Sequence, residues 1–169
     1  MSQPEMDADL HESVARYLRD QRLRLVTAES CTAGLIAAQL ASVPGAGEVL
    51  DCAFVVYDPK AKMRCLGVPA ELLATFNLTS EPVALAMARG ALQHCDANVA
   101  VANTGVADDA DPQIPAGTQC FAWIFRRGDQ THAFTATHRF TGERNAIREA
   151  SADHALRCLP HYHQLSLRS

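Results

Sequence analysis

The chain has 169 residues, 48% of them hydrophobic and 20% charged, which is typical of a folded globular protein and not of a disordered one. Its formal net charge is −4 and it contains no run of basic residues, so no nucleic-acid partner is expected. No apolar segment is long enough to cross a membrane and no secretory signal pattern is present, so we expect a cytoplasmic protein without a membrane partner.

The pattern of apolar residues predicts alternating helices and strands along one domain, residues 1–169, with loose tails at 1–6 and 161–169. Helices are expected from Asp7 or Asp9 to Gln21 and at 32–43, 58–66, 69–76, 80–95 and 143–159. Strands are expected at 24–28, 51–57, 98–103, 118–126 and 131–140, the last two forming a hairpin. The run at 51–57 is continuously apolar, which favours a buried strand.

This order of elements predicts an α/β fold: a single three-layer domain with a mixed, mostly parallel sheet and helices on both faces. Ligands of such sheets lie beyond the carboxyl ends of the parallel strands. Three loops are therefore expected to meet at that edge. They carry Ser30, Tyr57 with Lys62, and Thr104 with Gly105.

The turn at residues 29–32 (Glu-Ser-Cys-Thr) joins the first strand to the second helix and is rich in hydrogen-bonding groups. A hydroxyl there could act as a nucleophile, with the unpaired N–H groups of the helix stabilising an oxyanion. Serine and threonine are also the preferred N-caps of helices, and the turn alone favours a cap.

Six cysteines are widely spaced and form no CxxC pair or close Cys/His cluster, so we expect reduced, mostly buried thiols. His154, His161 and His163 could bind a metal, but a solvated tail is the simpler interpretation. No metal and no cofactor is predicted. The cysteines are Cys31, Cys52, Cys65, Cys95, Cys120 and Cys158.

Several ordered motifs resemble one known family. Residues 27–34 (Thr-Ala-Glu-Ser-Cys-Thr-Ala-Gly) are similar to the TAESCTGG signature of the CinA C-terminal domain family, the nicotinamide-nucleotide amidases. Further similarities follow in the order of the family at 55–57 with Lys62, 66–69, 80–81, 104–105, 115–118 and 140–144. The resemblance covers nearly the whole chain. It implies an α/β domain that deamidates nicotinamide mononucleotide, its small-molecule substrate, to nicotinic acid mononucleotide and ammonia.

The resemblance implies roles for particular residues. Ser30 matches the motif serine and becomes the candidate nucleophile, with Cys31 as its rival. Lys62 would be the base, with Tyr57 as the alternative. Without the resemblance, Lys62 would be interpreted as an exposed lysine on a short helix, and for Tyr57 an aromatic side chain packing on the core is an equal alternative. Arg144 and Arg148 lie four residues apart and could hold a phosphate, or form an ordinary solvated pair. The expected substrate-binding residues are Glu29, Thr32, Thr104, Gly105, Arg144 and Arg148.

Two departures from the family pattern fall on the expected site. Ala33 replaces the second glycine of the signature, and the glycine-rich loop after Gly105 is replaced by one with Asp108, Asp109 and Asp111. Carboxylates would repel a phosphate. The sequence therefore leaves three hypotheses: the amidase, an inactive relative that acts as a binding or regulatory module, and an amidase for an unphosphorylated amide. A homo-oligomer is also expected.

Overall fold

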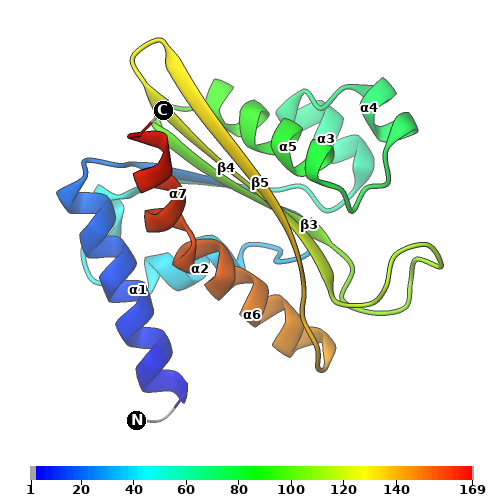
Figure 1. Cartoon of the computed structure of the whole chain (residues 1–169), viewed down its shortest axis with the longest axis horizontal. Helices are drawn as coiled ribbons and strands as arrows, with labels where there is room; N and C mark the ends of the chain where they lie inside the picture. Colours follow the sequence, from blue (N-terminus) through cyan, green and yellow to red (C-terminus); the bar gives the residue numbers. More distant parts are fainter. Residues whose placement is uncertain (1–2, 169) are drawn as a thin grey trace.

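Five strands form one mixed sheet between two layers of helices in the computed structural model, which describes residues 3–168 (Figure 1). The strands lie in the order β2-β1-β3-β4-β5; β1 is parallel to both β2 and β3, and the β3–β4 and β4–β5 pairs are antiparallel. The predicted three parallel strands followed by an antiparallel hairpin are confirmed. The strands are β1 (Leu25–Glu29), β2 (Leu50–Val55), β3 (Val99–Gly105), β4 (Thr118–Arg127) and β5 (Gln130–Arg139).

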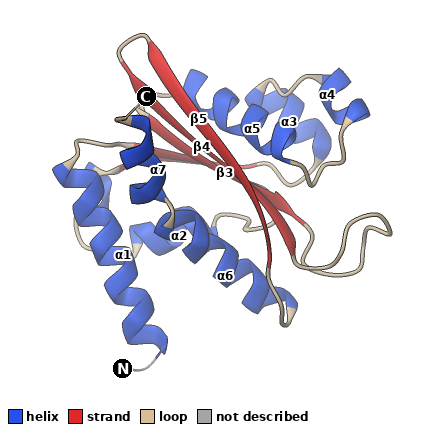
Figure 2. Ribbon diagram, in the orientation of Figure 1, coloured by secondary structure: helices blue, strands red, loops and turns tan. Residues whose placement is uncertain are grey.

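The helices cover both faces of this sheet, as Figure 2 shows. Four of them pack on one face: α1 (Gln3–Asp20), α2 (Leu35–Ala41), α6 (Arg144–Arg157) and α7 (Leu159–Ser166). The opposite face carries α3 (Pro59–Leu66), α4 (Ala70–Thr75) and α5 (Glu81–Gln93). A short 3-10 turn, η1 (Ala46–Glu48), precedes β2 in the chain. The expected three-layer α/β domain is confirmed.

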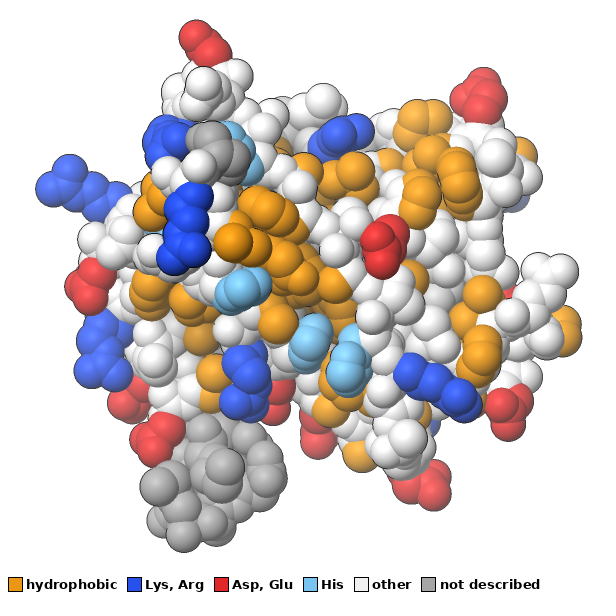
Figure 3. Space-filling model, in the orientation of Figure 1, with side chains coloured by type: hydrophobic (Ala, Val, Ile, Leu, Met, Phe, Trp, Pro, Cys, Tyr) orange, Lys and Arg blue, Asp and Glu red, His pale blue; other side chains and the backbone are white. Residues whose placement is uncertain are grey.

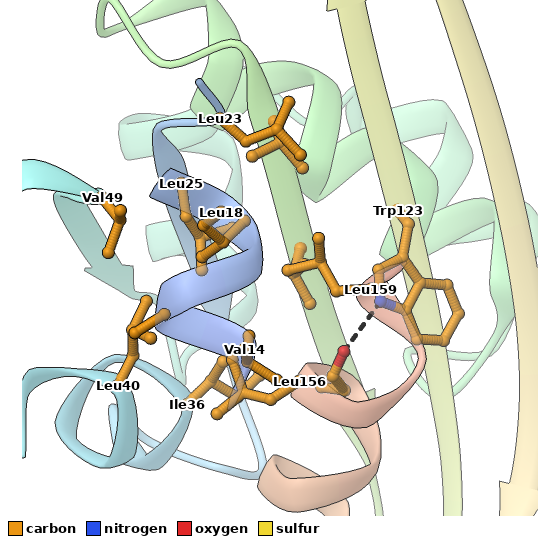
Figure 4. Close-up of a cluster of buried hydrophobic side chains, with 14 of the residues drawn as sticks. Val14, Leu18, Leu23, Leu25, Ile36, Leu40, Val49, Trp123, Leu156 and Leu159 are labelled. Carbon is orange, nitrogen blue, oxygen red and sulfur yellow. Dashed lines mark hydrogen bonds between the residues drawn. The ribbon is translucent and has the colours of Figure 1, made fainter. Parts of the chain in front are cut away.

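The core on the α1 side is built from large apolar side chains (Figure 4). Val14 and Leu18 of α1 meet Ile36 and Leu40 of α2 there, and all four are buried. The same layer contains Trp123, whose ring nitrogen donates a 2.9 Å hydrogen bond to the carbonyl of Ala155. A buried indole N–H needs such a partner, and this bond ties β4 to α6.

The core on the α5 side is built from small residues and allows close packing. The α5 alanines, among them Ala84 and Ala88, lie against Ala100 and Ala102 of β3. A Cβ on Gly90 would lie 2.0 Å from the Leu66 carbonyl oxygen, so only glycine lets α5 approach the end of α3. This contact fixes the position of α3, which carries Lys62.

Strand β2 is an edge strand, and the expectation of a buried strand at 51–57 is wrong. Leu50 pairs with Leu25 of β1, and no described strand pairs with the other edge of β2. Phe54 is half-buried and Val55 is 52% exposed. An apolar run shows that a segment prefers burial, but its place in the sheet is decided by the order in which the strands pair.

The C-terminal segment is also more ordered than expected. Residues 159–166 form α7, so residues 161–166 are not a loose tail, and the single helix predicted at 143–159 is two helices. His163 is 7% exposed, and its Nδ1 lies 2.8 Å from the hydroxyl of Tyr17. At the other end α1 begins at Gln3, and only residues 1–2 of the predicted leader lie outside the described residues.

Hydrophobic side chains also reach the surface where β5 lies beside α7, with histidines next to them (Figure 3). The rings of Phe134 and Tyr162 stack there at 5.2 Å, and those of His138 and His154 at 5.0 Å. None of the helices within residues 3–168 has both the length and the hydropathy needed to cross a membrane.

Candidate active site

The three predicted loops meet at the carboxyl ends of β1, β2 and β3 around a cavity of about 370 Å³. This volume falls in the range of small-ligand sites. Residues 77–79, which the sequence did not single out, complete the wall together with residues 106–108 and 110–111 of the acidic loop. The predicted residues that line the cavity are Ser30, Tyr57, Lys62, Thr104, Gly105 and Arg144.

Ser30 and Lys62 are in direct contact at the bottom of this cavity. The Nζ of Lys62 lies 3.0 Å from the Oγ of Ser30, and also 2.7 Å from the Val56 carbonyl oxygen and 3.1 Å from that of Tyr57. Lys62 is 1% exposed and Ser30 is 8% exposed. The side chain of Lys62 therefore does not extend into solvent, as a lysine on a short helix was expected to do without the family resemblance.

The surroundings of Lys62 favour its neutral form. Burial lowers the pKa of its ammonium group from 10.5 to about 8, and the nearby Asp58 carboxylate opposes only part of that change. A neutral amine has two hydrogens, and the carbonyls of Val56 and Tyr57 can accept both. Its lone pair is then left facing the Ser30 hydroxyl, which is the geometry of a base that takes a proton from a nucleophile.

Glu29 holds the turn rather than lining the cavity, so its expected substrate-binding role is corrected. Its carboxylate is fully buried and accepts hydrogen bonds from the hydroxyls of Thr27 and Thr32 at 2.9 and 2.7 Å. It also accepts the N–H groups of Gly34, Ile36 and Ala37 at 2.9–3.1 Å.

These bonds change the expected oxyanion site. The start of α2 favours a negative charge, but the Glu29 carboxylate already occupies that position. The N–H of Thr32 is bound as well, to the side-chain oxygen of Asn103 at 3.0 Å. Within residues 3–168 the N–H of Cys31 makes no hydrogen bond. Cys31 thus carries the N–H of this turn that can still serve an oxyanion.

A buried amide pair under the turn was missed by sequence reasoning. Asn103 donates to the side-chain oxygen of Gln119 at 2.9 Å, and Gln119 donates to the Val106 carbonyl at 3.1 Å. Both amides are fully buried. A Cβ on Gly105 would lie 2.2 Å from the Gln119 oxygen, so glycine is needed beside this pair. The signal that could have indicated this pair in the sequence is one polar amide residue within each of two apolar strands, Asn103 in β3 and Gln119 in β4.

Tyr57, Arg144 and Asp108 form a chain of contacts at the mouth of the cavity. Arg144 donates to the Tyr57 hydroxyl at 2.8 Å and makes a salt bridge with Asp108. Tyr57 is 57% exposed, so it does not pack into the core as the alternative interpretation required. The guanidinium that the resemblance assigns to phosphate is thus paired with a carboxylate from the acidic loop.

The other acidic residues of the loop behave differently from Asp108. Asp111 accepts a hydrogen bond from the side chain of Asn77 at 2.8 Å, and that bond lowers its pKa. Asp109 is exposed and makes no hydrogen bond in the described part of the chain. Only one of the three carboxylates is therefore bound to the arginine.

Three other residues expected to bind substrate support the turn or the wall. Thr32 is fully buried and does not line the cavity. Arg148 donates to the carbonyls of Cys31 and Thr32 at 2.9 and 3.3 Å, so it positions the turn and lies outside the cavity lining. Thr104 lines the cavity, but its hydroxyl donates to the Leu78 carbonyl at 2.8 Å and holds the 77–79 segment in place.

Cys31, the rival nucleophile, is 4% exposed and accepts a 3.4 Å contact from the Gln119 amide. Burial raises the pKa of its thiol. A thiol attacks as its thiolate, so this environment makes Cys31 a poor nucleophile at neutral pH. Its neighbour Ser30 has the contact with a base, Lys62, that Cys31 lacks.

Ala33 lies in a left-handed conformation with φ of 48°. This conformation costs an alanine roughly 1–2 kcal/mol, and glycine adopts it freely. We expect Ala33→Gly to raise the free energy of unfolding by about 0.5–1 kcal/mol, after part of the gain is lost to the greater freedom of glycine in the unfolded chain. Chemical denaturation measures the change.

The matched control for this prediction is Ala37→Gly in α2, where the backbone is helical. It should lower the free energy of unfolding by about 1 kcal/mol. A loss of stability in both variants would show that the left-handed turn does not strain Ala33.

The fold and this cavity define an α/β domain with a serine–lysine pair at the carboxyl edge of its sheet. The family model for the CinA C-terminal domain matches residues 7–163, and the chain belongs to this family. A CinA-like protein from Mycobacterium tuberculosis is 43% identical over 90% of this chain, and one from Akkermansia muciniphila is 40% identical over 88%.

Solved structures agree with this assignment. A CinA superfamily protein from Klebsiella pneumoniae has a TM-score of 0.83 at 36% identity, covering 89% of this chain and 92% of that one. A competence/damage inducible protein from Agrobacterium tumefaciens has a TM-score of 0.83 at 34% identity, covering 96% of each chain. The chain spans only 35–38% of the length of the curated relatives that it matches first.

Proposed function

We propose that this chain is an amidohydrolase that uses Ser30 as its nucleophile and Lys62 as its base. The observation that carries the proposal is the position of the Lys62 amine, 3.0 Å from the Ser30 hydroxyl and bound to two carbonyls. The CinA family match is compatible with a hydrolase. The substrate proposed first is the carboxamide of nicotinamide mononucleotide, which the resemblance implies.

In this mechanism Lys62 takes the proton of Ser30 while the Oγ of Ser30 forms a bond to the carboxamide carbon. The carbonyl oxygen becomes an oxyanion, for which the N–H of Cys31 is the free donor of the turn. When the C–N bond breaks, Lys62 returns the proton to the departing nitrogen and ammonia leaves. Water then attacks the acyl ester of Ser30 with Lys62 again as base, releasing the carboxylic acid.

Tyr57 is placed to bind substrate rather than to act as base. Its side-chain hydroxyl is held by Arg144 at the mouth of the cavity, while Lys62 contacts its backbone carbonyl near Ser30. The hydroxyl proton of Tyr57 is free to meet a polar group of the ligand. Base and binding functions are thus divided between Lys62 and Tyr57.

The experiment that tests the proposal is ammonia release from the purified chain offered nicotinamide mononucleotide, with Ser30→Ala as the control. Release above the control supports the proposed activity. Release from nicotinamide riboside but not from the mononucleotide supports an amidase for an unphosphorylated substrate. Absence of release from either compound contradicts the amidase proposal and favours a binding or regulatory module.

The salt bridge between Asp108 and Arg144 favours the unphosphorylated substrate as the second candidate. The Asp108 carboxylate lies against the Arg144 guanidinium, so it would repel the phosphate of a ligand and compete with that phosphate for the arginine. Both substrates share the same serine chemistry, so the two candidates differ only in what the mouth of the cavity accepts.

We expect Asp108→Asn to tighten binding of nicotinamide mononucleotide by roughly tenfold at low salt, and by less at high salt. Binding of nicotinamide riboside should not change, because it has no phosphate. Titration calorimetry in a Ser30→Ala background measures both ligands without turnover.

Asp109→Asn is the matched control, since it removes the same charge from the same loop without breaking the Arg144 pair. Asp109→Asn should change the affinity for nicotinamide mononucleotide less than Asp108→Asn does. Equal effects of Asp108→Asn on the two ligands would mean that Asp108 does not select against phosphate.

A further inference from the structure

Three side chains of metal-ligating types meet at the start of β2, at the opposite end of the strand from the candidate active site. Asp51 and Cys52 lie at the start of β2, and Cys95 lies just after the end of α5. One ligand atom from each residue lies within 4.8 Å of the other two, and all three residues are half-buried. The 42 residues between the two cysteines hide this cluster from any search for short Cys spacings.

A bulge in β2 brings Asp51 and Cys52 to the same side. Neighbouring residues of a regular strand point to opposite faces. Here Leu25 and Val26 of β1 pair with Leu50 and Cys52, so Asp51 is an extra residue without a partner. Bulges re-aim side chains in this way, and they are rare between parallel strands.

The end of α5 holds Cys95 beside this bulge. The Cys95 thiol donates to the Ala91 carbonyl at 3.3 Å, which keeps the side chain close to the last turn of the helix. The neighbouring His94 packs its ring against Phe54 of β2, with 6.0 Å between ring centroids. The His94–Phe54 contact thus joins the edge strand to the end of α5.

The Asp51 carboxylate of this cluster is already paired with a cation. Arg24 contributes one cation, since its Nε lies 2.7 Å from one oxygen of Asp51. That side chain is 49% exposed, so it reaches the carboxylate from the solvent side.

We propose that Asp51, Cys52 and Cys95 form a binding site for one thiophilic divalent ion of the zinc class. Two sulfurs and one carboxylate oxygen supply three ligands of a tetrahedral site, and a water molecule supplies the fourth. Thiolate ligands favour zinc, cobalt or cadmium over magnesium. Binding converts both thiols to thiolates and releases two protons to the solvent.

The ion would join the edge strand β2 to the end of α5, far from Ser30. It would link these two elements without touching the candidate active site, so the inference does not depend on the proposed amidase activity. Because the ion binds the folded chain, it should raise the melting temperature, and the rise should follow the logarithm of the free ion concentration once that exceeds the dissociation constant.

Cobalt titration of the full chain, kept reduced with a phosphine, tests the site. The expected result is a near-ultraviolet thiolate-to-cobalt charge-transfer band that saturates at one ion per chain, with two protons released. Histidine-bound cobalt gives no such band, so ions bound at the histidines beside α7 are distinguished. Cys52→Ser and Cys95→Ser should each abolish the saturable band, and Cys65→Ser, a half-buried cysteine of α3, should keep it.

Two further variants retain both thiols and change affinity in opposite directions. Asp51→Asn should weaken cobalt binding roughly tenfold or more, and Arg24→Gln should tighten it by removing the competing cation. Circular dichroism confirms that each variant is folded. The proposal is overturned if the wild-type chain shows no charge-transfer band, if the band survives in Cys52→Ser, or if neither charge variant changes the affinity.

Discussion

Ser30→Ala is expected to reduce amide hydrolysis by on the order of 10³-fold or more, because removing the nucleophile of a covalent mechanism removes its whole pathway. Within residues 3–168 the hydroxyl of Ser30 accepts no hydrogen bond from a backbone N–H of α2, since those N–H groups donate to Glu29. The free energy of unfolding should therefore change by less than about 0.5 kcal/mol. Ammonia release and denaturant unfolding measure the two effects.

Cys31→Ala is the matched control, one residue along the same turn. It should retain most of the activity, because its backbone N–H is unchanged and its buried thiol is not the nucleophile. A large loss of activity in Cys31→Ala with activity preserved in Ser30→Ala would assign the nucleophile to the thiol. If Ser30→Ala instead loses about 1 kcal/mol of stability and no activity, Ser30 is only a structural residue of the turn.

The second large effect is expected at Lys62. Lys62→Met should reduce hydrolysis by at least roughly 10²-fold, because no other described base contacts Ser30. The wild-type chain should show a kcat/KM that rises with pH and levels off above about pH 8, where the amine loses its proton. A pH series with stopped ammonia assays measures this profile.

The sign of the accompanying stability change follows from the same pKa. Lys62 titrates near pH 8 in the folded chain and near 10.5 when unfolded, so the unfolded chain binds more protons between these values. The contribution of Lys62 to the free energy of unfolding therefore rises from pH 8 to 10.5. Lys62→Met should remove this slope. An activity profile that is flat from pH 6 to 9 would contradict Lys62 as the base.

Local sequence patterns were sufficient for most of the elements and for their order. The amphipathic period of α1, the Ser80 start of α5 and the apolar runs of β1 and β3 all depend on neighbouring residues. The carboxyl ends of parallel strands always share one edge, so the meeting of Ser30, Lys62 and Thr104 followed from the topology alone.

Sequence reasoning gave the wrong account of Glu29 and of the helix N-terminus. An acidic residue in a turn beside a nucleophile suggests contact with substrate, but the Glu29 side chain turns inward to the N–H groups of α2. The direction of one side chain depends on its backbone angles and on which donors lie unpaired nearby, and neither is visible in a pattern.

The sequence by itself determined the layered α/β fold, the family motifs and the edge of the sheet where the cavity lies, because these depend on periodicity and strand order. Only the tertiary structure decided that β2 is an edge strand, that Asp108 pairs with Arg144, and that Cys52 meets Cys95. The Asp108–Arg144 and Cys52–Cys95 contacts join residues 36 or more positions apart, and the edge position of β2 depends on strand pairing. Such contacts form only when packing brings distant segments together, and no local pattern records which segments those will be.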